Sequence, residues 1–136
     1  MTPLWDYVHG PIRNEMQAWA KREKLGSRER AQLNQKLDML SRIGFEMARS
    51  LNCLAGTSGD HNHIFKLIVH SERMLRPMLC RGPVEPTVEA TLLCGAIEKD
   101  FKLDPSNASE QAEKNRQAVI SGAREGKEVR VSHERF

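Results

Sequence analysis

Cysteine is scarce in this chain, and its apolar runs are short. The 136 residues include three cysteines, none of which belongs to a C-x-x-C pair. An odd number of widely spaced cysteines argues against a disulfide framework and against a zinc ribbon. No apolar stretch approaches the roughly 18 residues of a membrane span. The first residues lack the basic and then apolar pattern of a signal peptide, so we predict a cytoplasmic protein without a membrane partner.

A large charge of one sign and a concentration of aromatic residues are absent as well. The chain has 21 Lys and Arg against 18 Asp and Glu, and 5% of its residues are aromatic. Because no segment is strongly basic, a surface for nucleic acid must be assembled by folding from scattered residues. The aromatic residues are too dispersed to form a base-stacking platform on one sheet face. No glycine-rich nucleotide-binding signature occurs either.

The hydrophobic residues, 39% of the chain, change from helical to extended periodicity along the sequence. Apolar positions three and four apart predict helices, whereas runs rich in β-branched and aromatic residues predict strands. The expected helices cover 11–24, 27–44 and 104–122, and the expected strands cover 4–8, 64–70, 74–80 and 88–96. We therefore predict an α+β fold in which an N-terminal helical hairpin packs on a three- to four-stranded antiparallel sheet with a C-terminal helix. Residues 1–122 form this domain, and residues 123–136 form a charged tail.

Five segments, in this order, are similar to those of one known family. Residues 30–44 form a leucine-spaced helical segment that ends at a glycine, and residues 64–67 precede a strand that carries Arg76. Residues 92–105 lead from an apolar strand through a charged turn into the start of the last helix, which carries Ala108, Ala112 and Arg116. Together they resemble the RelE/HigB-like toxin superfamily in its phage-derived branch, over residues 4–120.

The resemblance implies a RelE-like fold and a toxin that cuts messenger RNA (mRNA) on the ribosome. Its other partner is then a cognate antitoxin of the helix-turn-helix type. The implied chemistry is metal-independent transesterification by the ribose 2′-OH, with no metal and no cofactor. Such a site needs a base, an acid and cations near the developing phosphorane charge. The residues expected to supply it are Arg76, Lys99, His70 and Arg81 for catalysis and Lys66, Arg73 and Lys102 for RNA binding.

Arg76 is central to this expectation. A guanidinium matches two phosphate oxygens with two parallel N–H groups. Alternation along the strand places Arg76 on the face of Met74 and Met78, opposite the helical hairpin. We expect it to be an exposed clamp with Lys99 nearby. Pro77 is expected to introduce a bulge or to mark an edge strand.

Structural alternatives exist for the same residues. Arg76 can pair with Glu72 or Glu89 across the sheet, and arginines in turns are usually only solvated. Glu98 and Asp100 flank Lys99 at a position where the toxins commonly have paired lysines, and the net charge of +3 is low for holding a phosphate backbone. These departures favour a second hypothesis, a non-catalytic phage accessory protein that uses the toxin scaffold to bind a host protein.

The remaining histidines and cysteines indicate no further site. Asp60, His61 and His63 make half a metal site, but no third and fourth ligand is evident. Cys80 and Cys94 alternate with apolar residues on expected strands, which is typical of core thiols.

Overall fold

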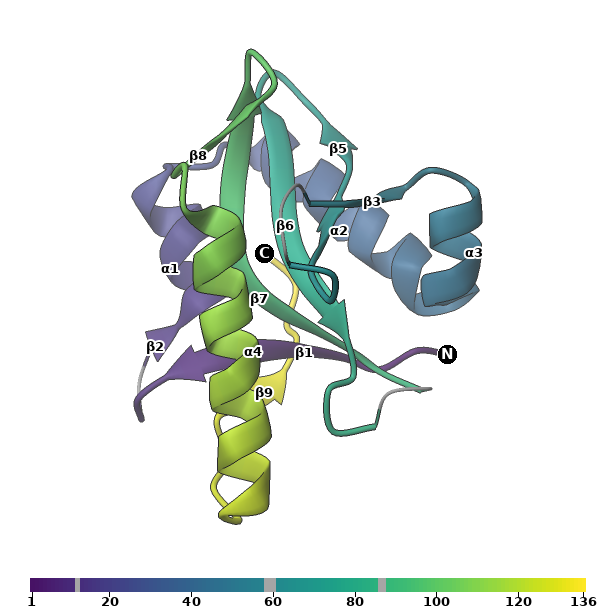
Figure 1. Ribbon diagram of the computed structural model, residues 1–136. Coiled ribbons are helices and arrows are strands. Elements are labelled where there is room, and N and C mark those ends of the chain that lie inside the picture. The colour runs from purple at the N-terminus through teal and green to yellow at the C-terminus, as the bar shows by residue number, and fades with distance from the viewer. Residues whose placement is uncertain (12, 58–60, 86–87) are drawn as a thin grey trace.

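The computed structural model describes residues 1–11, 13–57, 61–85 and 88–136. Within these residues, one nine-stranded sheet carries helices on both faces (Figure 1). The strands are β1 (Leu4–His9), β2 (Arg13–Asn14), β3 (Leu54–Gly56), β4 (Phe65–Leu67), β5 (Val69–His70), β6 (Met74–Arg81), β7 (Ala90–Lys99), β8 (Lys102–Asp104) and β9 (Arg130–Ser132). The helices are α1 (Glu15–Arg22), α2 (Ser27–Ile43), α3 (Phe45–Ser50) and α4 (Ala108–Arg124).

The sheet is mixed rather than antiparallel throughout. Its main path runs β2-β1-β7-β6-β4-β3, with β5 beside β6, β8 beside β7 and β9 beside β1. β1 pairs with β7 in parallel, with Leu4 opposite Ala90, and the other described pairs are antiparallel. The prediction of a three- to four-stranded antiparallel sheet is therefore wrong. A period-two pattern identifies a strand but not its distant neighbour, because tertiary packing sets such pairings.

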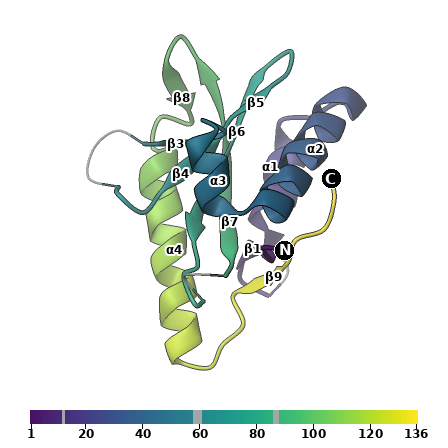
Figure 2. The same cartoon turned by 90° about the vertical axis from the view of Figure 1, so that its right-hand side faces the viewer.

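The helices are distributed around the sheet, so the predicted N-terminal hairpin packed on it is also wrong. α1 packs on β7 and β1, whereas α2 packs on α3 and β5. Figure 2 shows the sheet between α4 on one side and α1 and α2 on the other. The two N-terminal helices lie on different elements because each buries an apolar face of its own, Met16 and Trp19 on α1 and Leu33, Leu37 and Leu40 on α2.

The helix boundaries follow from local capping. Asn14 caps α1, because its Oδ1 accepts hydrogen bonds from the N–H groups of Met16 and Gln17 at 3.0 and 3.2 Å. α4 begins at Ala108 rather than at 104, since Asp104 still belongs to β8. None of the helices in the described ranges is long and apolar enough to cross a membrane.

β6 lies at the centre of the sheet, with β7 on one side and β4 and β5 on the other. Pro77 is therefore not on an edge strand, and the expected bulge occurs one residue later, between Met78 and Leu79. Two core clusters flank the strand. Leu75 and Leu79 face the α1 and α2 side, whereas Met78 and Cys80 face the α4 side. Side chains of β6 therefore alternate between the two faces of the sheet, and Arg76 lies on the same face as Met78.

Residues 123–136, predicted as a charged tail, lie against the domain. β9 pairs with β1, and Arg130 forms an ion pair with the buried Glu89. Nδ1 of His133 lies 2.9 Å from Oδ1 of Asp6, a fully buried carboxylate. The sequence held no local signal for these contacts, because they join segments that lie far apart in the chain.

Candidate functional site

A carboxylate held between two cations lies on the face of the sheet that carries α4. Lys66 Nζ lies 2.5 Å from Glu98 Oε1, and Arg76 Nη2 lies 3.2 Å from Glu98 Oε2. The three side chains come from the neighbouring strands β4, β6 and β7. Register brings them together, because Lys66 is opposite Met78, and Arg76 is opposite Ala96, two residues before Glu98 on the same face. We call these three residues the Glu98 cluster.

Arg76 is buried within this cluster. Its exposed fraction is 4%, its Nη1 donates to the Leu75 carbonyl at 3.0 Å, and its Nε has no hydrogen-bond partner among the described residues. The face is the expected one, but the expectation of an exposed clamp is wrong. The central position of β6 causes the burial, since strands flank Arg76 on both sides and Glu98 covers its guanidinium.

A surface pocket of about 290 Å³ adjoins the Glu98 cluster. It lies between β4, the β7–β8 hairpin and the start of α4. We call it the Lys66–Lys102 pocket, and it is lined by Thr57, Lys66, Glu98, Phe101, Lys102, Leu103, Ser106 and Ser109. Two ammonium groups and three hydroxyls therefore surround one carboxylate. Cations and hydroxyls of this kind are the side chains that usually contact phosphate groups.

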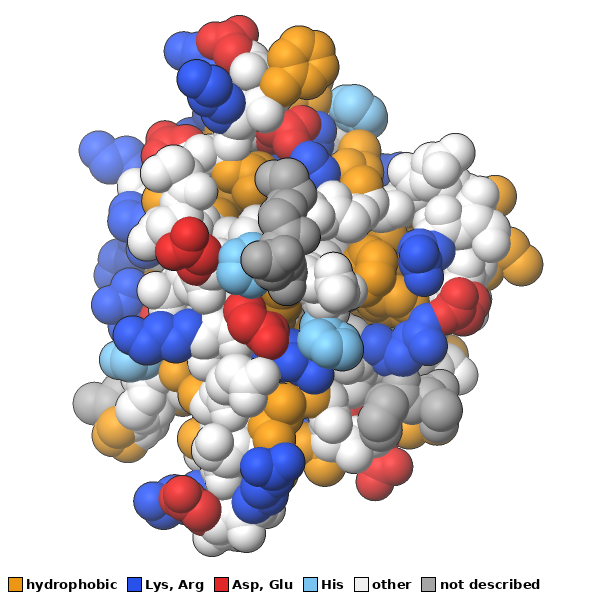
Figure 3. Space-filling model, viewed as in Figure 1, with side chains coloured by type: hydrophobic (Ala, Val, Ile, Leu, Met, Phe, Trp, Pro, Cys, Tyr) orange, Lys and Arg blue, Asp and Glu red, His pale blue; other side chains and the backbone are white. Residues whose placement is uncertain are grey.

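The surface around this pocket carries both signs of charge. Figure 3 shows the face with α4, where Lys and Arg side chains gather along the left edge, Asp and Glu side chains lie mainly over the centre and at the two ends, and apolar side chains reach the surface near the hairpin ends. Folding thus brings scattered basic residues together, and in the pocket Lys66 and Lys102 share the lining with Glu98.

The electrostatics keep Glu98 ionised. The hydrogen bond from Lys66 lowers the pKa of the Glu98 carboxyl below its ordinary value, the charges of Lys66 and Arg76 lower it further, and partial burial acts in the opposite direction. A carboxylate that is ionised at neutral pH accepts protons but does not donate them. Glu98 can therefore accept a proton within this pocket, although its lowered pKa and its pairing with two cations make it a weak base.

The structure brings together three of the seven predicted site residues. Lys66 and Arg76 share Glu98, and Lys102 lines the same pocket as Lys66. Lys99 is directly opposite Lys102 in the β7–β8 hairpin, but it is exposed and does not line the pocket.

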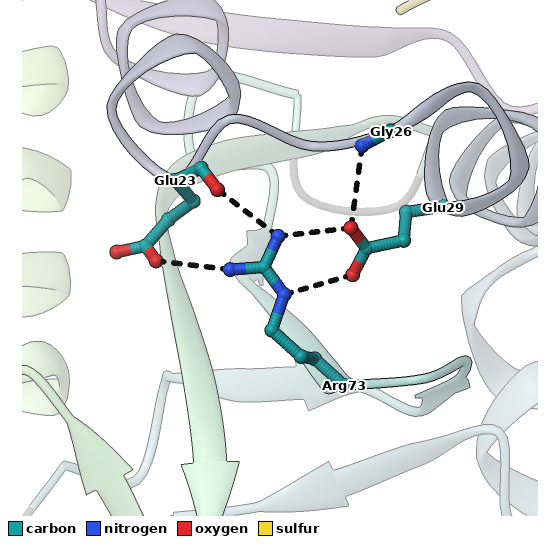
Figure 4. A network of polar contacts seen from close by, with 4 residues as sticks. All are labelled: Glu23, Gly26, Glu29 and Arg73. Carbon is teal, nitrogen blue, oxygen red and sulfur yellow. Dashed lines mark hydrogen bonds and ion pairs between the residues drawn. The ribbon is translucent and has the colours of Figure 1, made fainter.

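Arg73 is engaged in a network of its own (Figure 4). Its Nε and Nη2 donate to the Glu29 carboxylate at 3.0 and 2.8 Å, and Nη2 also donates to the Glu23 carbonyl at 3.0 Å. These bonds attach the β5–β6 turn to the connection between α1 and α2. The hydrogen bond from Arg73 lowers the pKa of Glu29. The N–H groups of Arg73 thus donate to oxygens of Glu23 and Glu29, and Arg73 does not line the pocket.

His70 and Arg81 also lie outside the pocket. The exposed His70 has its Nδ1 3.2 Å from the Met74 sulfur. Arg81, at the other end of β6, forms an ion pair with Glu46, and its guanidinium carbon lies 4.8 Å from the centroid of the Phe45 ring. A structural role explains the contacts of both residues.

Metal and thiol chemistry find no support within the described ranges. No group of three His, Cys, Asp or Glu side chains there is arranged to hold a metal ion. His61 and His63 are described, whereas Asp60 lies outside the described residues. Burial raises the pKa of both Cys80 and Cys94 to about 12, so these core cysteines are thiols rather than nucleophilic thiolates at neutral pH.

Glu98 was not predicted as a site residue from the sequence. Beside Lys99 it looked like a neutralising charge, and its true partners come from other strands. The register of the β6–β7 hairpin contained a signal, because a strand pairing of Arg76 with Ala96 places Glu98 diagonally across from the guanidinium.

Comparison of the chain with protein-family models, curated proteins and solved structures found no match. The geometry of the Lys66–Lys102 pocket is accordingly the basis for a functional assignment.

Proposed function

We propose that this protein binds single-stranded RNA in the Lys66–Lys102 pocket and cleaves it without a metal ion. The observation that carries the proposal is the ionised Glu98 between Lys66 and Arg76, in an open pocket with further cationic and hydroxyl groups. A phosphodiester needs cations to bind, and its attack by the 2′-OH needs a base beside those cations. The pocket contains both.

Each residue has a definite role in this reaction. Glu98 accepts the proton of the ribose 2′-OH, while the 2′ oxygen forms a bond to phosphorus and the bond from phosphorus to the 5′ oxygen breaks. Lys66 stabilises the charge that develops on the phosphorane oxygens. Lys102 donates a proton to the departing 5′ oxygen. The products are a 2′,3′-cyclic phosphate and a 5′-hydroxyl end.

Arg76 acts as a positioning residue. It is buried and contacts Glu98 rather than the pocket surface, so its guanidinium fixes the carboxylate orientation and keeps it ionised. The extension to mRNA on the ribosome, with an antitoxin as partner, stays a prediction that comes from the sequence resemblance.

Incubation of a labelled single-stranded RNA with the protein in excess chelator tests the proposal. We expect fragments that end in 2′,3′-cyclic phosphate. Lys66→Ala and Lys102→Ala should each weaken RNA binding and lower the slope of log affinity against log salt by about 1. Lys114→Ala, which removes the same charge from an exposed site on α4 outside the pocket, should leave that slope nearly unchanged. Absence of RNA binding by the wild-type protein at micromolar concentration would contradict the proposal.

Binding without cleavage is the second candidate function. The observation in its favour is that both oxygens of Glu98 already accept a hydrogen bond, one from Lys66 and one from Arg76. Such a carboxylate also suits a purely structural network, and the protein is then an RNA-binding module without catalytic activity. RNA that is bound but never cleaved is the result expected for this candidate.

A further inference from the structure

The tip of the β7–β8 hairpin combines backbone strain with an exposed aromatic side chain. Lys99 pairs with Lys102, which leaves Asp100 and Phe101 as a two-residue turn. Both have positive φ, +53° and +63°. Turns of this type favour glycine and asparagine at these positions, and a large side chain there is unfavourable. Phe101 is also fully exposed, with a relative accessibility of 101%. The hairpin requires the positive φ angles, but it does not require a large, exposed aromatic side chain at position 101.

Phe101 lies beside the candidate site. Phe101 lines the Lys66–Lys102 pocket, and Lys102 follows it directly in the chain. An aromatic face that lies beside ammonium groups matches one repeating unit of single-stranded nucleic acid, a base next to its phosphate. Strained conformations of this kind persist preferentially at ligand-binding positions.

We propose that Phe101 stacks on an unpaired nucleobase of the RNA whose phosphate binds at Lys66 and Lys102. This inference rests on the proposed function, and it adds the requirement that the base be unpaired. Stacking on one aromatic side chain is worth about 1–3 kcal/mol per base, which corresponds to a change in affinity of roughly 5- to 150-fold. A base inside a duplex has both faces covered, so a paired RNA is excluded from this contact.

The alternative role for Phe101 is a purely local one in the hairpin. A structural Phe would be buried against neighbouring side chains, and its replacement would lower stability. The complete exposure of Phe101 predicts the opposite, since Phe101→Gly removes the unfavourable side chain from a left-handed position. The thermal unfolding midpoint of Phe101→Gly should therefore be equal to or higher than that of the wild type.

Binding of two matched ligands tests the proposal. One is a hexameric single-stranded RNA, and the other is the same ribose-phosphate chain without bases. We expect Phe101→Ala to weaken RNA binding at least fivefold and to leave binding of the abasic chain unchanged. Phe101→Trp should retain RNA binding, and its fluorescence should be quenched by the RNA and not by the abasic chain. Leu51→Ala removes another exposed apolar side chain outside the pocket and should change neither affinity.

The outcomes separate the two proposals. Equal RNA affinity of Phe101→Ala and wild type, with normal binding of the abasic chain, overturns the stacking inference and leaves the phosphate pocket intact. Failure of the wild type to bind either ligand overturns both proposals. Equal affinity of the wild type for the hexamer and for its duplex also contradicts stacking on an unpaired base.

Discussion

The indole ring of Trp19 lies directly against the backbone of Gly95. A Cβ atom added to Gly95 would lie 1.9 Å from Cδ2 of that ring. Trp19 is 1% exposed, so the ring cannot move aside into solvent. This contact fixes the distance between α1 and the central strand β7, and it explains a glycine in the middle of a buried strand.

Gly95→Ala should therefore destabilise the protein. The added methyl group must displace a rigid, enclosed ring, and overpacking of this kind costs about 1–3 kcal/mol. Urea unfolding at equilibrium measures the change. Gly56→Ala serves as the control, because a Cβ at Gly56 has no heavy atom within 4 Å. Equal stability of Gly95→Ala and Gly56→Ala would show that α1 does not pack on β7 as described.

The contact of Arg73 with Glu29 should stabilise the fold in a pH-dependent manner. The bidentate pair joins the β5–β6 turn to α2, and a double-mutant cycle with Arg73→Ala and Glu29→Gln should give a coupling free energy of about 1 kcal/mol, reduced by the partial exposure of Arg73. Because the pKa of Glu29 is lowered in the folded state, this stabilisation is present above about pH 4.5 and is lost as the pH falls further. A coupling energy that is unchanged at pH 3 would contradict this account.

Arg76→Ala should lower stability, in contrast to the behaviour of an exposed clamp. The substitution leaves a half-buried Glu98 with one cation instead of two and opens space beside β6, for a loss of about 2 kcal/mol. Arg124→Ala removes an exposed arginine of α4 and should change stability by less than about 0.5 kcal/mol. Thermal unfolding followed by circular dichroism compares the two variants. The account of the buried cluster is wrong if Arg76→Ala unfolds at the wild-type temperature.

The sequence predicted the features that neighbouring residues determine. It did not predict the features that depend on residues far apart in the chain. Amphipathic spacing located α2 and its buried Leu37, and alternation placed Arg76 on the correct face of β6. The parallel partner of β1 and the attachment of His133 to Asp6 were not predictable, since no turn or local pattern connects such distant segments. Packing of the whole chain decides them.

In the candidate site, too, local features were predicted and contacts between distant residues were not. Lys66 and Lys102 were predicted RNA-binding residues, and the structure places both in one pocket. Glu98 was interpreted by its sequence neighbours, although its partners are across the sheet. Arg81 was grouped with Arg76 because it directly follows the expected strand of Arg76, yet it lies at the far end of β6 with Glu46. Residue type and strand membership were visible in the sequence, but proximity between strands was not.

The rate of RNA cleavage should not change with pH through Glu98 around neutrality. Since its pKa is lowered, the carboxylate is ionised over the whole neutral range, and protonation removes the base only below about pH 4.5. Single-turnover cleavage should therefore show no loss of rate from this group between about pH 8 and pH 6. A base that titrates near neutrality would instead give a decline in this interval, and a decline that persists in Glu98→Gln would assign the base to another residue.

Cleavage by Glu98→Gln is the most direct test of the central claim. The amide keeps the shape of the side chain and still accepts a hydrogen bond, but it cannot take the proton of the 2′-OH. Under single-turnover conditions with saturating protein, we predict a rate at least about 100-fold below that of the wild type, with RNA binding no weaker. Glu98→Gln that cleaves RNA as fast as the wild type, or a wild type that binds RNA and leaves it intact, would contradict the assignment of this pocket as a ribonuclease site.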